Sequence, residues 1–238
     1  IYSEKITPFQ TVQSEILQDF STTFGRATLS AYVGFVDLAG FSTSVSGKTP
    51  DQIAEFLEPF LRDLIGIIRG RRALIDKTIG EEVMFVLPET EEEEDAHETL
   101  FLGQLMGGLH DLAFKFNGRY RFRFGLSYGK VRFFNIKGSG YSEWTAVGET
   151  VHVAKRLHSL EELSDPRPVI GAFGMQATTD SAVEVKQVME HRHSFISGFA
   201  SRFEYRFRDG PVPLKGVGDV MCALLLPRPE SVDEEKTG

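Results

Sequence analysis

The chain has 238 residues, of which 41% are hydrophobic and 25% charged, so it can bury a full core as one domain or at most two. Its formal net charge of -8 excludes the basic surface that a nucleic-acid-binding protein needs. The single cysteine, Cys222, excludes a disulfide framework and a cysteine zinc site, and it is typical of a reducing compartment. Because no apolar run has the length of a membrane span and the N-terminus lacks a signal-peptide pattern, we expect a cytoplasmic protein with neither a membrane nor a nucleic acid as partner.

The first half of the chain alternates between strand and helix patterns. A leader, residues 1–30, contains helical apolar spacing at 12–24. The elements predicted after it are a buried strand at 31–36, a helix at 50–70, strands at 74–75 and 83–87 joined by a turn at 80–81, a helix at 96–116 and a strand at 119–127. We expect Gly129 and Lys130 to turn the chain into a further strand at 131–136. This order predicts an α+β fold with a ferredoxin-like βαββαβ core.

The second half appends further strands and helices to this core. The predicted elements are helices at 149–160 and 175–189 and strands at 203–207 and 220–226. Pro166 and Pro168 are expected to limit the strand at 169–170 to a short, non-central one, because proline cannot donate to a ladder. The domain predicted in this way covers residues 31–226, and the proline- and charge-rich residues 227–238 are expected to form a disordered tail.

Asp37 stands where the buried strand ends, before a turn that contains Gly40. A carboxylate at a strand end, beside backbone amides freed by a glycine turn, can hold a divalent cation against phosphates. The same residue can simply cap the helix that follows, so this segment alone leaves both interpretations open.

Five segments of the chain are similar to segments of one known family. They are VDLAGFS at 36–42, DKTIGEEVM at 76–84, FGLSYGKV at 124–131, WTAVGETVHVAKRL at 144–157 and, more weakly, LKGV at 214–217. In this order they resemble the catalytic domain of class III nucleotidyl cyclases, over about residues 30–226. The resemblance implies the class III cyclase fold and a homodimer whose two active sites are shared between the chains. Each site would convert a nucleoside triphosphate to a 3′,5′-cyclic nucleotide and pyrophosphate.

The resemblance also implies two divalent ions, Mn²⁺ or Mg²⁺, in each active site. Their ligands match the Asp37 carboxylate, the Leu38 carbonyl and the Glu81 carboxylate. Glu81 departs from the family, which usually has an aspartate there, and a longer carboxylate shifts the metal or changes its binding mode. Glu82 is a substitute only if it faces the same side, whereas adjacent strand residues face opposite sides. The alternative is that one metal site is impaired.

The phosphate groups are expected to meet backbone amides and basic side chains. The resemblance matches the amides of Ala39, Gly40 and Phe41 to phosphate oxygens. Lys130 and Lys215 fall near positions where the family uses basic groups on the terminal phosphates.

Helical spacing places Glu149, His152 and Arg156 on one face of the helix predicted at 149–160, which follows Gly148. Arg156 matches the family's arginine that stabilises the α-phosphate in the transition state, a role suited to a guanidinium. His152 stands where the family usually has an asparagine that positions the ribose, and the alternative for a lone histidine is a surface role. Arg121 and Arg123 have no role in this scheme and, on an alternating strand, are expected to face solvent.

Lys77 and Thr145 match the two base-reading positions of adenylate cyclases, some of which in bacteria use threonine. A lysine can donate to the N1 acceptor of a purine, and a hydroxyl can donate or accept. The same pair can also read the O4 and N3 edge of uracil. A guanylate cyclase would usually have a carboxylate at the position of Lys77, so GTP is not the expected substrate.

The departures at Glu81 and His152, in a chain that resembles a bare catalytic domain, look like the standalone pyrimidine cyclases of bacterial Pycsar anti-phage systems. The sequence therefore favours a uridylate cyclase that makes cyclic UMP from UTP as an antiviral second messenger for an effector protein. An adenylate cyclase that makes cyclic AMP from ATP is the close alternative. A catalytically silent cyclase-homology module, which dimerises or binds nucleotide, is the third interpretation.

Overall fold

The computed structural model describes residues 28–69, 73–89, 96–115, 121–138, 141–164, 167, 169–176, 183, 187 and 203–228. The helix expected at 12–24, most of the helix expected at 175–189 and nearly all of the tail expected at 227–238 lie outside these residues. The division into a leader, a domain at 31–226 and a tail therefore stays a prediction.

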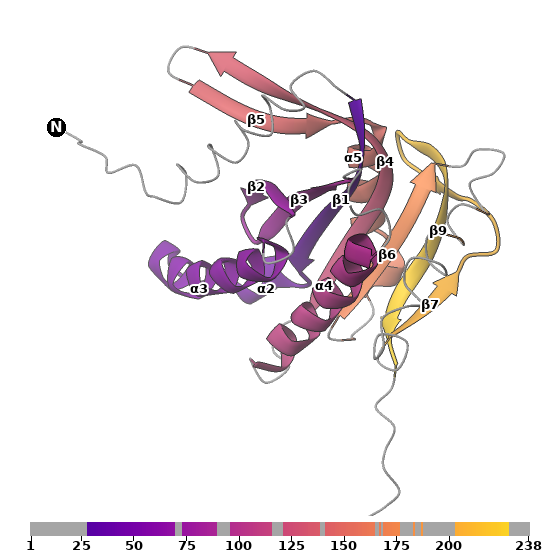
Figure 1. Cartoon of the computed structure of the whole chain (residues 1–238). Coiled ribbons are helices and arrows are strands. Elements are labelled where there is room, and N and C mark those ends of the chain that lie inside the picture. Colours follow the sequence, from indigo (N-terminus) through magenta and orange to yellow (C-terminus); the bar gives the residue numbers. More distant parts are fainter. Residues whose placement is uncertain are drawn as a thin grey trace, which may run out of the picture.

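The described residues form one nine-stranded sheet with helices on both faces (Figure 1). Its strands are β1 (Thr28–Leu38), β2 (Leu74–Ile79), β3 (Glu82–Pro88), β4 (Phe122–Gly138), β5 (Tyr141–Val147), β6 (Val169–Gln176), β7 (Phe203–Phe207), β8 (Val212–Leu214) and β9 (Gly218–Pro227). The helices are α2 (Phe41–Ser44), α3 (Pro50–Arg69), α4 (Ala96–Lys115) and α5 (Glu149–His158), followed by a 3₁₀ turn at Glu161–Ser164. The strand order is β2-β3-β1-β4-β6-β9-β7, with β5 beside β4 and β8 beside β9.

The first strands and helices confirm the predicted α+β fold with a ferredoxin-like core. β1 lies between β3 and β4 and is antiparallel to both, while α3 connects β1 to β2 and α4 connects β3 to β4. Side chains of β1 alternate between two buried faces. Val36 and Leu38 pack in the core under α3 and α4, whereas Phe35 and Asp37 face the side that carries α5.

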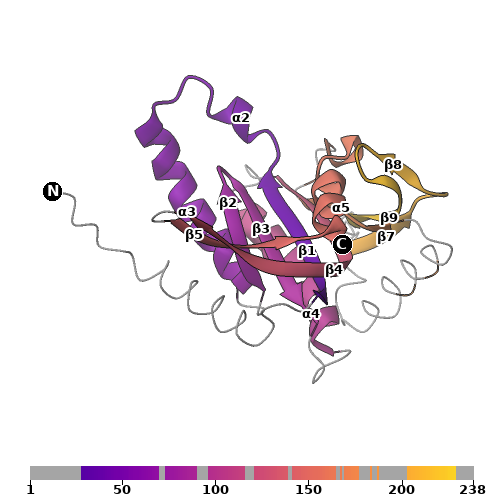
Figure 2. The ribbon, with the colours of Figure 1, turned by 90° about the horizontal axis from the view of Figure 1, so that it is seen from above.

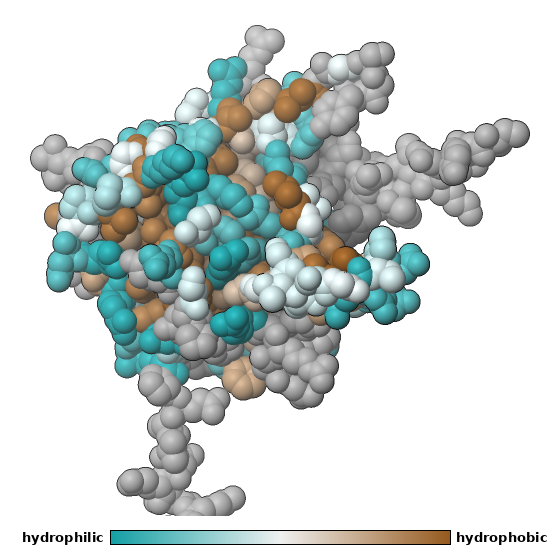
Figure 3. All heavy atoms as spheres, turned by 180° about the vertical axis from the view of Figure 1, so that it is seen from behind, coloured by the Kyte–Doolittle hydropathy of each residue, from teal (hydrophilic) through white to brown (hydrophobic). Residues whose placement is uncertain are grey.

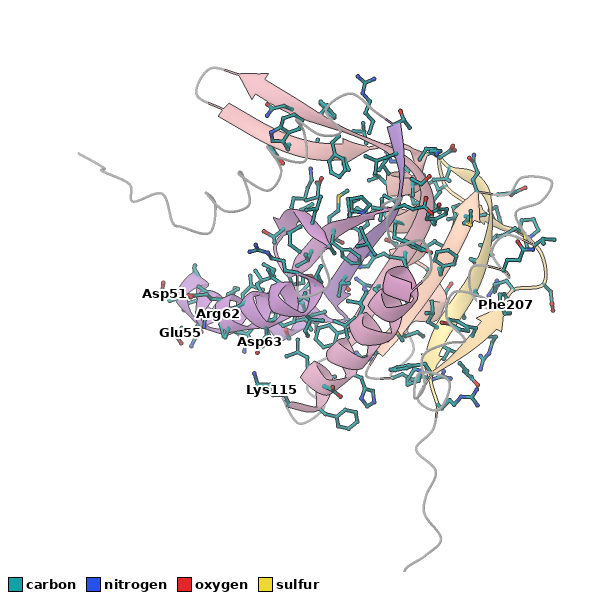
Figure 4. All side chains as sticks on the ribbon, in the orientation of Figure 1. Asp51, Glu55, Arg62, Asp63, Lys115 and Phe207 are labelled. Carbon is teal, nitrogen blue, oxygen red and sulfur yellow. The ribbon has the colours of Figure 1, made fainter. Side chains whose placement is uncertain are left out.

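Helices α3 and α4 cover one face of the sheet because each has an apolar stripe. On α3, Phe60, Leu64 and Ile68 recur at helical spacing and are fully buried. At the surface between the two helices, Lys115 donates to Asp63 at 2.8 Å (Figure 4). Among the described helices, none combines the length and apolar character that crossing a bilayer demands.

Strands β4 and β5 form a long hairpin that extends from the sheet, and seen from above it passes over β1, β2 and β3 (Figures 1 and 2). Its second strand reaches β2, where the Ala146 amide donates to the Asp76 carboxylate at 2.7 Å. The hairpin therefore places residues of β5 beside residues of the β2–β3 hairpin, although they are far apart in the sequence.

Two predictions about strands were wrong. The expected turn at Gly129 and Lys130 is absent, because β4 runs through both residues and stays paired with β1 on either side of them. A Cβ on Gly129 would lie 2.7 Å from the Thr150 hydroxyl, so the glycine permits the close approach of α5 and makes no turn. The strand expected at 169–170 is the eight-residue β6, which lies between β4 and β9, because both prolines precede it and remove nothing from its ladder.

Candidate active site

Asp37 is buried at the end of β1, on the sheet face that α5 covers. Arg123 binds it through both oxygens, donating from Nε at 2.7 Å and from Nη2 at 2.8 Å. Nε2 of His158 lies 3.1 Å from Oδ2 of the same carboxylate. Burial alone would raise the pKa of Asp37, but the neighbouring His158 and Arg123 outweigh it and hold the pKa below its usual range.

A second carboxylate, Glu82, lies beside this group. Lys155 donates to its Oε2, and Nδ1 of His158 lies 3.6 Å from the same oxygen. The His158 side chain is 4% exposed, and among the described residues neither of its ring nitrogens has a hydrogen-bond partner. Asp37, Glu82 and His158 each offer one ligand atom, and these atoms lie within 4.8 Å of one another, so the three could hold a metal ion.

The sheet register and one glycine bring these groups together. Asp37 pairs with Arg123 across β1 and β4, and the antiparallel register of β1 with β3 leads to Glu82 on the other side. Helix α5 comes close to the sheet because Gly125 has no side chain, and a Cβ there would overlap the backbone nitrogen of His158. The end of α5 can therefore insert His158 between the two carboxylates.

Lys77 and Thr145 meet on this same face of the sheet. Nζ of Lys77 donates to Oγ1 of Thr145 at 3.0 Å. The buried Asp76 carboxylate accepts the Thr145 hydroxyl at 3.1 Å and the Ala146 amide at 2.7 Å. Nζ of Lys77 also lies 3.4 Å from Asp76 and 3.6 Å from Glu143. One buried acid thus organises the two residues that the sequence assigns to the base.

These contacts fix the direction of hydrogen bonding around Thr145. Its single hydroxyl hydrogen is given to Asp76, and one lone pair accepts from Lys77. Toward a ligand Thr145 is then an acceptor, while Lys77 supplies the donor. Burial raises the pKa of Asp76, partly offset by the Ala146 amide and Lys77, which favour the charged form.

The glycine turn after β1 has the left-handed backbone that its sequence predicts, with φ +79° at Gly40. The Ala39 amide donates to the Arg121 carbonyl at 2.8 Å, so it is already engaged. A cavity of about 270 Å³ opens beside the turn, and its lining includes Phe41, Lys48 and the Arg121 side chain. Arg121, expected to face solvent, is half-buried at the wall of this cavity.

His152 and Arg156 lie on the exposed face of α5, as their spacing predicts. In the part of the chain that the structure describes, neither side chain forms a hydrogen bond or ion pair, and neither meets Asp37. The structure thus separates, within one chain, two groups that the sequence assigns to the same reaction.

The other predicted residues lie at different ends of the sheet, because Glu81 is near the Asp37 end of β1 whereas Lys130 pairs with Ser30 near its other end. Glu81 is half-buried in the β2–β3 turn and does not belong to the group formed by Asp37, Glu82 and His158. Lys130 is exposed and donates to the Ser30 hydroxyl at 2.9 Å, and Lys215 is exposed before β9.

Sequence reasoning assigned no role to Arg123, His158 or Asp76. Arg123 was expected to face solvent and instead binds Asp37, because the alternating face that looked polar is the one that α5 covers. The nearest sequence signal for His158 is its position six residues after His152, which places it on the opposite, buried face of α5. For Asp76, the only sequence signal of a role at the base site is its position directly before Lys77, which the sequence assigns to the base.

Comparisons with known proteins agree with this fold. No family model matches the chain. The receptor-type guanylate cyclase gcy-23 of Caenorhabditis elegans is 26% identical over 209 residues, which cover 86% of this chain. The chain spans only 17% of the length of that relative.

Solved structures of cyclases superpose on most of the chain. The adenylyl cyclase CyaB from P. aeruginosa matches with a TM-score of 0.62 at 16% identity, covering 86% of this chain and 97% of that one. The guanylate cyclase domain of RhGC from Catenaria anguillulae, in complex with GTP, matches with a TM-score of 0.59 at 20% identity, covering 84% and 98%. The chain therefore has the mixed α+β fold of class III cyclase catalytic domains.

Proposed function

We propose that the chain is a nucleotidyl cyclase, a lyase that converts a nucleoside triphosphate to a 3′,5′-cyclic nucleotide and pyrophosphate. The observation that supports this best is the donor–acceptor pair of Lys77 and Thr145, on the same sheet face as the buried Asp37. The reaction needs one group of residues that binds the nucleotide base and another that binds the metal ion and the triphosphate. The cyclase fold supplies a frame for both.

The residues around Asp37 fit a divalent metal, because two carboxylates meet there beside an imidazole whose nitrogens lack hydrogen bonds. Asp37, the Leu38 carbonyl and an acid of the β2–β3 turn, Glu81 or Glu82, would hold it. When bound, Mn²⁺ or Mg²⁺ lowers the pKa of the ribose 3′-hydroxyl and balances phosphate charge. Asp37 suits this role because its lowered pKa keeps it ionised at neutral pH.

The remaining predicted residues act on the ribose and the phosphates. Arg156 would donate to the α-phosphate and stabilise the charge that develops as the 3′-oxygen attacks and pyrophosphate leaves. His152 would donate to the ribose or to the α-phosphate. Lys130, Lys215 and the backbone amides of Gly40 and Phe41 would bind the outer phosphates, whereas the Ala39 amide is held by the Arg121 carbonyl.

We propose that the active site is shared between two copies of the chain. Within one chain, His152 and Arg156 point outward from α5 and do not reach Asp37, so a second chain must supply one of these two halves. Large apolar side chains are exposed on the two hairpins, namely Ile79, Phe134, Ile136 and Val147. Figure 3 shows apolar groups at the surface among hydrophilic ones, and a homodimer would cover part of this surface.

UTP is the first substrate that we propose, with cyclic UMP serving as an antiviral second messenger. Lys77 would donate to O4 of uracil while Thr145 accepts from its N3–H, which matches the hydrogen-bond direction set by Asp76. Adenine also presents one donor and one acceptor, through its amino group and N1, and one of the matching structures is named as an adenylyl cyclase. ATP is therefore the second candidate.

The test is to incubate the purified chain with each of the four ribonucleoside triphosphates and Mn²⁺, and to identify products by mass spectrometry. Cyclic UMP alone would support the proposed substrate. Cyclic AMP as the only product would contradict UTP as the substrate but support the proposed cyclase activity. The absence of product from every nucleotide would reject the proposed function in favour of a silent dimerisation or nucleotide-binding module.

A further inference from the structure

His158, the last residue of α5, is a buried side chain whose ring nitrogens form no well-aligned hydrogen bond with a described residue, although both lie within ion-pair distance of carboxylates. Only 4% of its side chain is exposed. Burying polar groups without partners is unfavourable, and native structures rarely leave them so. The position of this imidazole therefore needs a reason beyond packing.

Both nitrogens of His158 face carboxylate oxygens. Nε2 lies 3.1 Å from Oδ2 of Asp37, and Nδ1 lies 3.6 Å from Oε2 of Glu82. One ligand atom from each of the three residues lies within 4.8 Å of the others. An imidazole and two carboxylates at this spacing are a ligand set for first-row divalent metals.

Two protein cations hold the carboxylates in this structure. Arg123 donates twice to Asp37, and Lys155 donates to Glu82. Both reach the cluster on long side chains, of which 32% and 43% respectively are exposed. A divalent ion carries the same charge as these two cations together. It can therefore replace them while their flexible stems move toward solvent.

We propose that Asp37, Glu82 and His158 of a single chain bind one divalent transition-metal ion, in exchange for Arg123 and Lys155. This deepens the proposed function and rests on it, since it names ligands of the same metal centre. The imidazole makes the site selective. Mg²⁺ prefers oxygen ligands and keeps its waters, whereas Mn²⁺, Co²⁺ and Zn²⁺ accept an imidazole.

The first test measures Mn²⁺ binding to the full chain without nucleotide, from the loss of the free-ion signal in electron paramagnetic resonance. Glu82→Gln is expected to weaken Mn²⁺ binding at least about tenfold, because it removes a charged ligand. Glu81→Gln, which changes the other acid of the turn, is compared with it, and Glu58→Gln on the exposed side of α3 is the matched control that should leave the affinity unchanged. The reverse result, loss only in Glu81→Gln, would overturn the proposed ligand set.

The second test asks directly whether a nitrogen atom binds the metal. Electron spin echo spectra of the bound Mn²⁺ should show nitrogen modulation, which His158→Gln removes and His152→Gln keeps. A wild-type spectrum without nitrogen modulation would overturn the proposal. This result does not depend on whether a variant folds, because it is measured on the wild-type protein. Mg²⁺ should compete with Mn²⁺ only weakly, and competition at equal affinity would also count against an imidazole ligand.

These measurements separate the inference from the proposed function because they involve no turnover. If the wild-type chain makes a cyclic nucleotide but substitution of Glu82 or His158 leaves the Mn²⁺ affinity unchanged, the ligand set is wrong and the proposed activity stands. If Mn²⁺ binds through these residues but no nucleotide is cyclised, the ligand set stands and the proposed activity is wrong.

Discussion

The two polar clusters on the α5 face of the sheet are built on different principles. Around Lys77 and Thr145, the single buried acid Asp76 sets every hydrogen-bond direction, and one of its donors is a backbone amide. Around Asp37, charged groups balance one another, and the ring nitrogens of His158 face two carboxylates without forming a hydrogen bond to a described residue. The first arrangement is preorganised before a ligand arrives, whereas the second can exchange its cations. Recognition of a base suits the first, and metal binding suits the second.

The largest expected effect comes from removing the charge of Asp37. Asp37→Asn keeps the shape of the side chain but removes an ionised ligand, so kcat should fall at least about a hundredfold. Cyclic product measured by mass spectrometry, with circular dichroism as a check of folding, tests this. Asp63→Asn, which breaks a surface ion pair with Lys115, is the matched control and should keep its activity. Near wild-type turnover by Asp37→Asn would contradict the metal assignment.

Removing the guanidinium of Arg156 should have the next largest effect. Because Arg156 is exposed and free of ion pairs in the described structure, Arg156→Ala should leave the stability unchanged while kcat drops about a hundredfold. Steady-state kinetics separate kcat from KM. The matched control is Arg62→Ala on α3 (Figure 4), which removes an exposed arginine. Arg62 forms an ion pair with Glu58. A rise in KM with kcat unchanged would show that Arg156 does not act on the transition state.

A smaller effect is expected from Asp76, which touches no substrate and positions Thr145. In Asp76→Asn the side-chain amide can donate to Thr145, which frees the hydroxyl to donate to the base. We expect KM for the preferred nucleotide to rise about tenfold, the value of one hydrogen bond, and the preference between UTP and ATP to narrow. Glu143→Gln, at the exposed side of Lys77, is the control. An unchanged preference in Asp76→Asn would mean that Asp76 is only structural.

The smallest effect concerns the pH dependence of stability. Burial raises the pKa of Asp76, so folding favours its protonated form. Its stabilising contribution is therefore present below the ordinary carboxyl pKa, near about pH 4, and is lost as the pH rises through the raised value. As the pH rises from about 4 through the raised pKa, the free energy of unfolding of the wild-type protein, measured with denaturant, should fall relative to that of Asp76→Asn. A constant difference between the two proteins would contradict the raised pKa.

The sequence predicted those features that depend on local pattern. The strand that ends at Asp37, the turn at Gly80 and Glu81, and the face shared by His152 and Arg156 all follow from spacing along the chain. The core order of strands and helices follows from the same periodicity, although the continuous course of β4 does not. Local patterns were enough because neighbours in these elements are neighbours in the sequence.

What the sequence could not predict depends on register and on distant contacts. The contact of Arg123 with Asp37 requires the pairing of β4 with β1, which alternation alone does not set. The position of His158 depends on Gly125, a residue of another strand that lets α5 approach the sheet. The hydrogen bond from Thr145 to Asp76 requires the β4–β5 hairpin to reach β2.

The most direct test of the account is complementation between two inactive chains. Asp37→Asn lacks the metal ligand and Arg156→Ala lacks the phosphate-binding guanidinium, and a shared site needs only one intact copy of each. Mixing the two variants after subunit exchange, verified by mass spectrometry of the heterodimer, should restore a substantial fraction of wild-type cyclic nucleotide synthesis. No recovery in a verified heterodimer would contradict the proposal that two chains build one cyclase site.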